Sequence, residues 1–250
     1  EALHKIEATA DRILAEIGIE LREDEEALRL YREAGAKVTE ISAQAWNLKF
    51  EPGMIREILK TAPGRFTQYA RNPANNVEIG GDAMVFAPSY GSPFVMDMDN
   101  GRRYGTIADF ENLVKLAQSS PWLHHSGGTI CEPTDVPVNK RHLDMVYAHM
   151  RYSDRAFLGS ITAPERAADS IEMCRILFGA DFVDRNCVIM GNFNTTSPLV
   201  LDGVTTAGIR TYAEAGQASI HLPFLLGGAV APLTMAGAVA QCLAESMASC

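Results

Sequence analysis

The sequence lacks an excess of basic charge. Its 22 Lys and Arg residues are outnumbered by 31 Asp and Glu residues, which gives a formal net charge of −9. Proteins that bind nucleic acids or anionic membrane surfaces use basic faces that displace counterions. We therefore expect no nucleic-acid partner and no membrane partner, and the composition favours a small molecule or another protein as the ligand.

Regularly spaced cysteine pairs are also missing. The five cysteines include no CxxC pair, so the sequence indicates neither a disulfide framework nor a zinc site. We expect reduced thiols in a cytoplasmic protein. Cys131 is the cysteine closest to a predicted site, but no paired base that would make it a nucleophile is evident beside it.

Targeting and membrane-spanning segments are not evident. The first residues have neither the basic region nor the apolar run of a signal peptide. Residues 215–244 carry no charged side chain and are long enough to cross a bilayer, but two prolines and a Gly-Gly pair interrupt them. We predict a buried strand, a loop and a buried helix for this stretch.

Residues 1–80 are predicted to form an N-terminal helical cap or subdomain. Apolar residues recur on one helical face within residues 1–17, directly before Gly18. The same pattern fills residues 24–34, and a third short helix is predicted for residues 52–62. From residue 81 onward the pattern changes.

Residues 81–250 contain short apolar runs that are each followed by an amphipathic helix, which is typical of βα units. The predicted strands are residues 84–87, 122–125, 156–159, 187–190 and 218–221. The predicted helices follow start signals at Thr106, Asn139, Pro164, Asp202 and Pro232. An Asn100-Gly101 pair also predicts a hairpin turn before Tyr104, which would shield a site or an interface.

No glycine-rich phosphate loop follows the first predicted strand, which argues against a doubly wound nucleotide-binding sheet. We predict an α/β fold, a (β/α)8 TIM-type barrel of which about five βα units are present. Five units would leave two unpaired sheet edges, which natural proteins avoid. We therefore expect the barrel to continue beyond residue 250.

Barrel enzymes build their sites from the carboxyl ends of the strands and the loops that follow them. At these positions the sequence places neutral hydrogen-bonding groups, aromatic rings and one carboxylate. The predicted catalytic residue is Glu132, and the predicted substrate contacts are Tyr90, Phe94, Asn192, Asn194, His221 and Phe224. Barrel packing is the alternative for each contact, and an ion pair with a neighbouring helix is the alternative for Glu132.

The histidines do not indicate a metal site. His124 and His125 are adjacent, and adjacent residues of a strand point to opposite faces, so they cannot share one coordination shell. No metal-binding histidine spacing is present. His142 and His149 lie seven residues apart on one helix face and are interpreted as packing or surface residues.

Several motifs together resemble one known family. They are Gly80-Gly81-Asp82, Phe86-Ala87-Pro88, residues 102–106, residues 124–132, residues 135–144, Gly179-Ala180-Asp181-Phe182 and residues 194–198. These motifs, spread over essentially all 250 residues, resemble the trimethylamine methyltransferase (MttB) family. The resemblance implies a βα barrel that passes a methyl group from a methylated amine to the cobalt of a corrinoid carried by a separate partner protein.

Two kinds of members of this family have similar sequences. One kind carries pyrrolysine and acts on trimethylamine, and a larger set has no pyrrolysine. Some of the latter demethylate quaternary amines such as glycine betaine, and the resemblance implies a member of this second kind. The pyrrolysine position of the first kind would fall after residue 250. The resemblance also implies that this chain itself holds no corrinoid tightly.

The chemistry favours a quaternary amine, because its nitrogen leaves as a neutral tertiary amine when the methyl group is attacked. Such a substrate requires a cation site, and the rings of Tyr90, Phe94 and Phe224 can each supply about 0.5–2 kcal/mol of cation–π attraction. Asn192 and Asn194 are predicted to hydrogen-bond a substrate carboxylate. Two alternatives stay open: a metal-dependent barrel hydrolase or lyase, and a non-catalytic betaine-binding barrel. A homo-oligomer is also expected.

Overall fold

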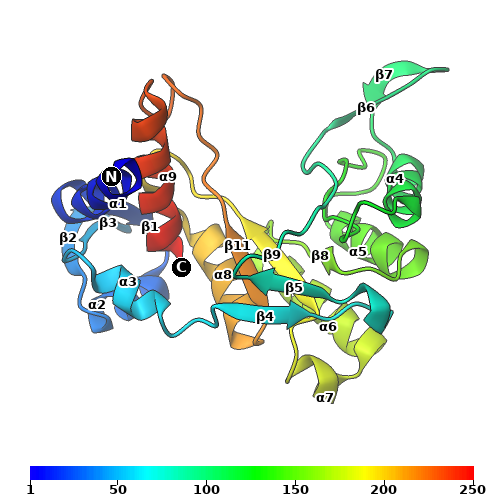
Figure 1. Ribbon diagram of the computed structural model, residues 1–250, viewed down its shortest axis with the longest axis horizontal. Helices are drawn as coiled ribbons and strands as arrows, with labels where there is room; N and C mark the ends of the chain where they lie inside the picture. The colour runs from blue at the N-terminus through cyan, green and yellow to red at the C-terminus, as the bar shows by residue number, and fades with distance from the viewer. The chain divides into compact units, whose positions relative to one another are not determined.

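The computed structural model describes all of residues 1–250 and shows a mixed α/β chain with helices and several small sheets (Figure 1). The chain divides into two compact units. Unit 1 comprises residues 1–63, 192–210 and 220–250, and unit 2 comprises residues 64–191 and 211–219. None of the helices has the length and apolar character needed to span a bilayer.

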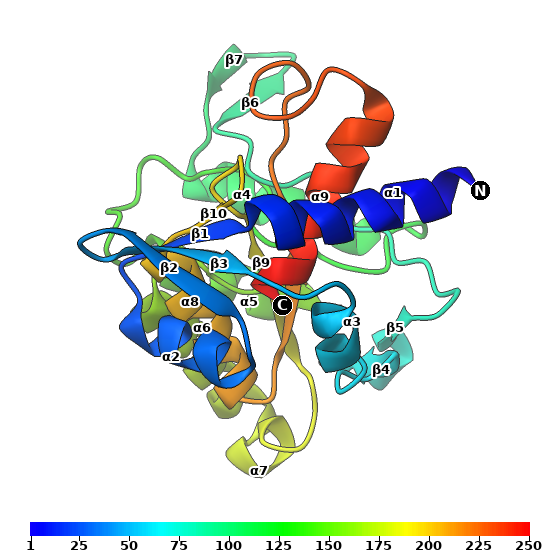
Figure 2. The same ribbon diagram turned by 90° about the vertical axis from the view of Figure 1, so that its left-hand side faces the viewer.

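Unit 1 contains a four-stranded sheet with the order β10-β1-β3-β2, packed with helices. Its strands are β1 (Ile19–Arg22), β2 (Lys37–Ser42), β3 (Ala45–Lys49) and β10 (Val200–Leu201). Its helices are α1 (Ala2–Arg12), the π-helical turn η1 (Ile13–Ile17), α2 (Glu25–Glu33), α3 (Met54–Leu59) and α9 (Met235–Ser249). β1 pairs antiparallel with β3 and parallel with β10. Helices α1 and α9 pack against each other (Figure 2).

The helical prediction for residues 1–80 is incomplete. Its three helices are confirmed as α1 with η1, α2 and α3, but the strands between them were missed. In β1, Ile19 and Leu21 are both fully buried, and Leu48 of β3 is buried beside them in the same core. This alternation marks a strand with one face in the core, but it extends over too few residues to stand out beside the helical periodicity.

Gly18 ends the first helix as predicted, and its position requires glycine. Its φ is 86°, a left-handed value that other residues rarely adopt. A Cβ atom at this position would lie 2.4 Å from the carbonyl oxygen of Leu48. The close approach of the helix end to strand β3 therefore depends on the missing side chain.

Unit 2 holds two antiparallel pairs, β4-β5 and β6-β7, and contributes to a three-stranded sheet with the order β11-β9-β8. The strands are β4 (Arg65–Gln68), β5 (Val77–Gly80), β6 (Phe94–Asp97), β7 (Gly101–Tyr104), β8 (Phe157–Leu158), β9 (Ile189–Phe193) and β11 (Ala218–His221). The helices are the 3-10 turn η2 (Pro73–Asn75), α4 (Ile107–Ser119), α5 (Arg141–Tyr152), α6 (Pro164–Phe178) and α7 (Ala180–Val183). The chain passes between the units within β9, within β11 and within α8 (Gly203–Glu214).

Three of the five predicted barrel strands are confirmed. They are β8, β9 and β11, and β8 pairs parallel with β9. Helices follow β8 and β11 directly, whereas the short strand β10 comes between β9 and α8, so strands and helices alternate from residue 156 onward with one added strand. The strand pairings establish an α/β fold with small sheets, whereas a complete TIM barrel is not seen in residues 1–250.

The predictions of strands at residues 84–87 and 122–125 are wrong. Met84, Phe86 and Trp122 are 71%, 52% and 80% exposed, so these apolar runs do not enter a core. The two segments do lie side by side, since His124 N–H donates to the Phe86 carbonyl. Phe86 N–H in turn donates to the imidazole Nδ1 of His124 at 3.0 Å, which replaces the backbone acceptor that a strand ladder needs.

The predicted helices after residue 81 are all present, and three of the predicted start signals are seen in the structure, whereas α5 begins after Lys140 and α9 after Thr234. Thr106 and Asp109 form a complete capping box at the start of α4. Pro164 occupies the first turn of α6, and the Asp202 side chain accepts from the backbone N–H of Thr205 at the start of α8. The predicted hairpin is confirmed as β6 and β7, which extend away from α4 (Figure 1).

Candidate functional site

A partly open pocket of about 60 Å³ lies in unit 2, where β8 ends and helices α5 and α6 begin. Its charged and aromatic lining comes from Tyr90, Glu132, Arg141, His142 and Arg166. Hydroxyl groups of Thr129, Ser160 and Thr162 complete its polar surface. This volume holds several water-sized groups, so the pocket can take a polar part of a small ligand.

Two predicted site residues, Tyr90 and Glu132, are brought together in this pocket. The Tyr90 ring lies close to the backbone of Gly128, where an added Cβ would meet Cε2 of the ring at 2.7 Å and Cβ of Leu158 at 2.9 Å. Desolvation of the phenol raises the pKa of Tyr90 above its usual value, so the hydroxyl stays protonated at neutral pH.

Glu132 forms an ion pair with Arg141, the first residue of α5. The other guanidinium N–H groups of Arg141 donate to the Val136 carbonyl, at 3.2 Å from Nε and 3.0 Å from Nη2. The ion pair proposed as the alternative role for Glu132 is therefore present. It holds the carboxylate in place.

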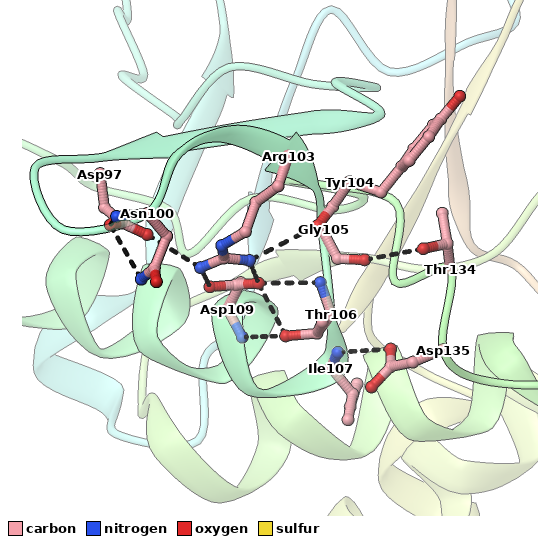
Figure 3. A network of polar contacts seen from close by, with 10 residues as sticks. All are labelled: Asp97, Asn100, Arg103, Tyr104, Gly105, Thr106, Ile107, Asp109, Thr134 and Asp135. Atoms are coloured by element: carbon pink, nitrogen blue, oxygen red, sulfur yellow. Dashed lines mark hydrogen bonds and ion pairs between the residues drawn. The ribbon is translucent and has the colours of Figure 1, made fainter.

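The loop that carries Glu132 is fixed by a network around the start of α4 (Figure 3). Arg103 donates to Asp97 at 2.9 Å and to Asp109 at 2.7 Å, and these bonds join the β6-β7 hairpin to the helix. Thr134 donates its hydroxyl to the Gly105 carbonyl at 3.2 Å, and Asp135 accepts from the backbone N–H of Ile107 at 2.8 Å. The pKa of Asp109 is held well below its usual value, chiefly by its hydrogen bond to Arg103.

His142 is buried in the pocket wall with one ring nitrogen unused. Its Nε2 lies 2.7 Å from Oδ2 of Asp169 on α6. A carboxylate only accepts, so Nε2 carries the proton. Nδ1 is buried and has no hydrogen-bond partner. Buried polar atoms are nearly always satisfied in native proteins, so this one requires an explanation.

Arg166 lines the same pocket from the first turn of α6. Its Nη1 donates to the hydroxyl of Thr162 at 2.8 Å. It forms no salt bridge, unlike Arg141 on the opposite helix. Arg166 therefore places an uncompensated positive charge beside the pocket.

Two other buried histidines in unit 2 have both ring nitrogens engaged. His149 is bonded to the Gly128 carbonyl through Nε2 at 2.8 Å and to the Ser126 hydroxyl through Nδ1 at 3.0 Å. His125 contacts Gln68 through Nε2 and accepts from Gly127 N–H through Nδ1. Burial lowers the pKa of His149 to about 4 and that of His125 to about 3, so both are neutral.

The histidine pair considered for a metal lies in two different environments, although residues 122–125 do not form the strand from which their separation was predicted. The ring of His124 stacks on Phe86, whereas His125 is buried against Gln68. Across residues 1–250 no group of three or more His, Cys, Asp or Glu side chains is arranged to hold a metal ion. Burial raises the pKa of Cys131 to about 11, so its thiol is protonated at neutral pH and poorly suited to nucleophilic attack.

Phe94 is placed outside the pocket, on the β6-β7 hairpin. The guanidinium carbon of Arg102 lies 3.6 Å from the centroid of its ring. The ring of Tyr104 lies 4.7 Å away at a tilt of 33°. Phe94 therefore already carries a cation from its own hairpin on its ring.

The remaining predicted contacts belong to unit 1. Asn192 is buried, and its Oδ1 has no hydrogen-bond partner, whereas Asn194 is exposed. Nδ1 of His221 lies 3.1 Å from the Ser249 hydroxyl, and burial lowers the pKa of His221 to about 4. Phe224 is 68% exposed.

The loop after Asn192 is held by a fully buried carboxylate that sequence reasoning missed. Glu245 of α9 accepts from the hydroxyls of Thr195 and Ser197 and from the backbone N–H of Leu199 at 3.0 Å. Gln241 donates to it from the preceding turn of the helix. Glu245 therefore fixes the backbone on which Asn192 and Asn194 lie.

Sequence reasoning also missed His142, Arg166 and Asp169. His142 was interpreted as a packing or surface residue, and the charges of α6 were not considered. One signal was available: His142 and Arg166 both fall in the first turn of a helix that follows a predicted strand, and barrel sites gather there. The pairing of His142 with Asp169 has no sequence signature, because it joins residues 27 positions apart.

Comparison with known proteins identifies the family. The family model described as trimethylamine methyltransferase (MTTB) matches residues 1–250 of the chain. The chain belongs to the trimethylamine methyltransferase family. It is also 41% identical, over 249 residues, to a protein of Desulfitobacterium hafniense (strain Y51) named glycine betaine methyltransferase.

The alignment with that relative covers 99% of this chain and 51% of the relative. The chain therefore spans about half the length of the curated relative that it matches. The family resemblance inferred from the motifs is confirmed over the whole chain. The pocket described above thus lies within the residues that match the family model.

Proposed function

We propose that the protein of which these residues form part transfers a methyl group from a quaternary amine of the glycine betaine type to the Co(I) of a corrinoid protein. The observation that carries this proposal is the 41% identity to a glycine betaine methyltransferase over nearly the whole chain. The match of the family model over residues 1–250 supports the reaction class. The corrinoid is the methyl acceptor, a second substrate that arrives on its own protein.

The proposed methyl transfer requires little acid or base catalysis by the residues of this chain. The methyl carbon forms a bond to the two-electron nucleophile, the C–N bond breaks, and the nitrogen keeps its electron pair and leaves as a neutral tertiary amine. No proton has to move to the nitrogen. The work of the protein is to bind the cation, orient one methyl group and leave that group open to the acceptor.

Tyr90 is proposed as the cation contact and Glu132 as its charge partner. Tyr90 lines the pocket, and its hydroxyl is protonated at neutral pH because its pKa is raised. A tyrosine face attracts a quaternary ammonium by about 0.5–2 kcal/mol. Glu132 is held by Arg141, so it orients the cation through a fixed carboxylate and takes no part in proton transfer.

A TIM barrel is proposed as the complete architecture. β8 and β9 pair parallel, and single parallel bridges join His125 to Ala156 and Gln68 to Cys187. The pocket lies at the carboxyl end of β8, where barrel enzymes place their sites.

The five cysteines are free, which supports a cytoplasmic location. Exposed Met96 and Met98 on the β6-β7 hairpin support a homo-oligomer.

The test is a methyl-transfer assay with the full-length protein and a reduced corrinoid protein. Glycine betaine, carnitine, proline betaine and trimethylamine are supplied in turn, and the absorbance of the methylated corrinoid is followed. We expect turnover with glycine betaine and release of dimethylglycine. Turnover confined to trimethylamine would overturn the substrate class, and an absence of turnover with a reducible partner would favour the non-catalytic binding alternative.

Two variants test the pocket. Tyr90→Ala is expected to raise KM for glycine betaine by about ten-fold, since it removes an aromatic face worth about 1–2 kcal/mol. Tyr90→Phe keeps the face and is the matched control, with KM close to that of the wild type. Glu132→Gln is expected to raise KM by a smaller factor. Unchanged turnover in both Tyr90→Ala and Glu132→Gln would place the amine elsewhere.

A further inference from the structure

Two helices begin at the pocket, and neither has a side-chain cap. α5 follows Lys140 and α6 follows Ala163, and neither of these residues accepts a capping hydrogen bond through its side chain. The first N–H groups of a helix lack intrahelical partners and carry partial positive charge. His142 and Arg166 lie in these two first turns and line the pocket. Both helix ends therefore favour an anion there.

The charged side chains around the pocket point to the same sign of ligand. Arg141 and Glu132 neutralise each other in an ion pair. Arg166 makes its side-chain bond to the neutral hydroxyl of Thr162 and has no carboxylate partner. The pocket thus keeps one positive charge beside two helix N-termini. An anionic group entering it would complete the charge balance.

The unused nitrogen of His142 is an independent sign of a ligand. The residue is 4% exposed and lines the pocket, and its Nδ1 is buried without a partner. Leaving a buried polar atom unsatisfied costs free energy, so a ligand group that bonds to Nδ1 would recover this cost. With Asp169 on Nε2, an imidazolium would present an N–H from Nδ1 to an incoming anion.

Helix α6 explains how these groups are positioned. Arg166 and Asp169 are three residues apart on α6, so they lie on the same face of the helix, one turn from each other. Helices α5 and α6 pack together, and Asp169 reaches across to His142 on α5. One helix face therefore supplies both a direct cationic contact and the carboxylate that orients the histidine.

We propose that this pocket binds the carboxylate of a betaine substrate through Arg166 and Nδ1 of His142, with Asp169 as the positioning residue. The proposal rests on the proposed function and replaces Asn192 and Asn194 in the role first predicted for them. Tyr90 lines the same pocket, and its ring is left for the methylated ammonium end. A zwitterion then meets a cationic subsite and an aromatic subsite within one cavity.

The test separates carboxylate binding from methyl transfer by using a probe that cannot donate a methyl group. 3,3-Dimethylbutyrate carries the carboxylate of a betaine and a neutral tert-butyl group in place of the ammonium. Its binding to the full-length protein is measured by calorimetry and compared with that of 3,3-dimethylbutan-1-ol and inorganic phosphate. We expect the carboxylate to bind and the alcohol to bind far more weakly.

Variants assign the contacts. Arg166→Gln and His142→Phe are each expected to weaken 3,3-dimethylbutyrate binding by about ten-fold or more, as expected for loss of a charge-assisted hydrogen bond. Arg175→Gln is the matched control on the same helix, because its guanidinium pairs with Asp184 and does not line the pocket. Asp169→Ala is expected to raise KM for glycine betaine with kcat unchanged, and Asp169→Glu to restore it in part.

Each outcome bears on the proposal. Failure of the wild type to bind 3,3-dimethylbutyrate, or equal affinity in Arg166→Gln and His142→Phe, would overturn it. Arg166-dependent binding of phosphate without binding of the carboxylate would assign the pocket to an inorganic anion and overturn it too. If glycine betaine is demethylated and Arg166→Gln has no effect, the proposed function is supported and the carboxylate site is overturned. Arg166-dependent probe binding without any methyl transfer leaves the carboxylate site standing alone.

Discussion

His142 and His149 lie two turns apart on helix α5, both are buried, and their surroundings differ in one respect. Both ring nitrogens of His149 are bonded, to the Gly128 carbonyl and the Ser126 hydroxyl. His142 is bonded on one side only, to Asp169, and its other nitrogen lines a pocket without a partner.

The difference teaches how to distinguish a structural histidine from a binding one within a single helix. His149 also packs between aromatic rings, with Phe157 stacked at 5.8 Å and Phe110 edge-on at 5.3 Å. Its environment is complete, so its removal affects folding. One ring nitrogen of His142 has no partner, so removal of His142 is expected to affect the binding of a ligand more than folding. The predictions below test this distinction, from the largest expected effect to the smallest.

The largest effect is expected on stability from His149→Ala. Loss of the buried ring leaves a cavity and unsatisfied groups on Ser126 and Gly128, with an expected loss of about 3 kcal/mol or more. His142→Ala also removes a buried ring, but that ring borders a partly open pocket that water can enter, and only one hydrogen bond, to a half-exposed carboxylate, is lost. A loss of about 1–2 kcal/mol is therefore expected. Urea unfolding of the two variants at pH 8 measures both.

Equal losses in the two variants would contradict the comparison. His149→Phe is the check on volume, because it keeps a ring in the cavity and removes only the polar contacts. Its loss of stability is expected to lie between those of the two alanine variants. Circular dichroism at low denaturant confirms that each variant is folded before the free energies are compared.

The second prediction concerns acid sensitivity. Burial lowers the pKa of His149 to about 4, below the value near 6.5 expected when unfolded. The unfolded chain therefore binds a proton between pH 6.5 and about 4 that the folded chain does not bind. The stabilisation is fully present above pH 6.5 and falls as the pH drops, by about 1.4 kcal/mol per pH unit.

The free energy of unfolding, measured from pH 8 to pH 5, is expected to fall less steeply in His149→Phe than in the wild type. At pH 8 the histidine is neutral in both states, so the two curves differ there only by a constant offset. Parallel curves over the whole range would show that His149 titrates alike in folded and unfolded chains, and would contradict its buried, neutral state.

The third prediction extends the comparison to a network that is complete but lies near the surface. Asp109 caps α4 and accepts from Arg103 in the network of Figure 3. Asp109→Ala is expected to cost about 1–2 kcal/mol, because a helix cap is lost and a guanidinium loses its partner. Asp99→Ala, on the exposed hairpin turn, is the control with no expected change. Thermal unfolding of both measures the difference.

The smallest effect is expected at Cys131. Its thiol is buried and protonated, since its pKa is raised to about 11 by burial. Cys131→Ala should leave methyl transfer unchanged and cost little stability. Loss of turnover with the fold intact would show that the thiol takes part in the reaction, and would require a base that the structure does not place beside it.

The fold was predictable where local signals agree with burial. The capping box at Thr106, Pro164 at the start of α6 and the Asn100-Gly101 turn each act within a few residues, so the sequence alone locates them. The strand predictions near Phe86 and Trp122 were wrong because these apolar residues are exposed, and distant parts of the chain decide which residues are buried. The strands of residues 1–80 were missed for the related reason that their buried runs are short.

The site was predictable in position and only partly in composition. Tyr90 and Glu132 were predicted from the rule that barrel sites follow strand ends. Both line the pocket, although the segments predicted as the strands before them, residues 84–87 and 122–125, are not strands. His142 was not separated from His149, because the two share a helix face and differ only in their partners. Those partners, Asp169 and the Gly128 carbonyl, are set by tertiary packing that periodicity cannot show.

The backbone of Gly128 lies against the ring of Tyr90, one of the residues that line the pocket. The Tyr90 ring can lie as deep as it does because no Cβ stands in its way. A methyl group at this position would push the ring outward and shrink the space that a substrate can fill. Under the proposed function, the missing side chain of Gly128 would therefore set how large an amine fits beside Tyr90, although Gly128 itself makes none of the proposed binding contacts.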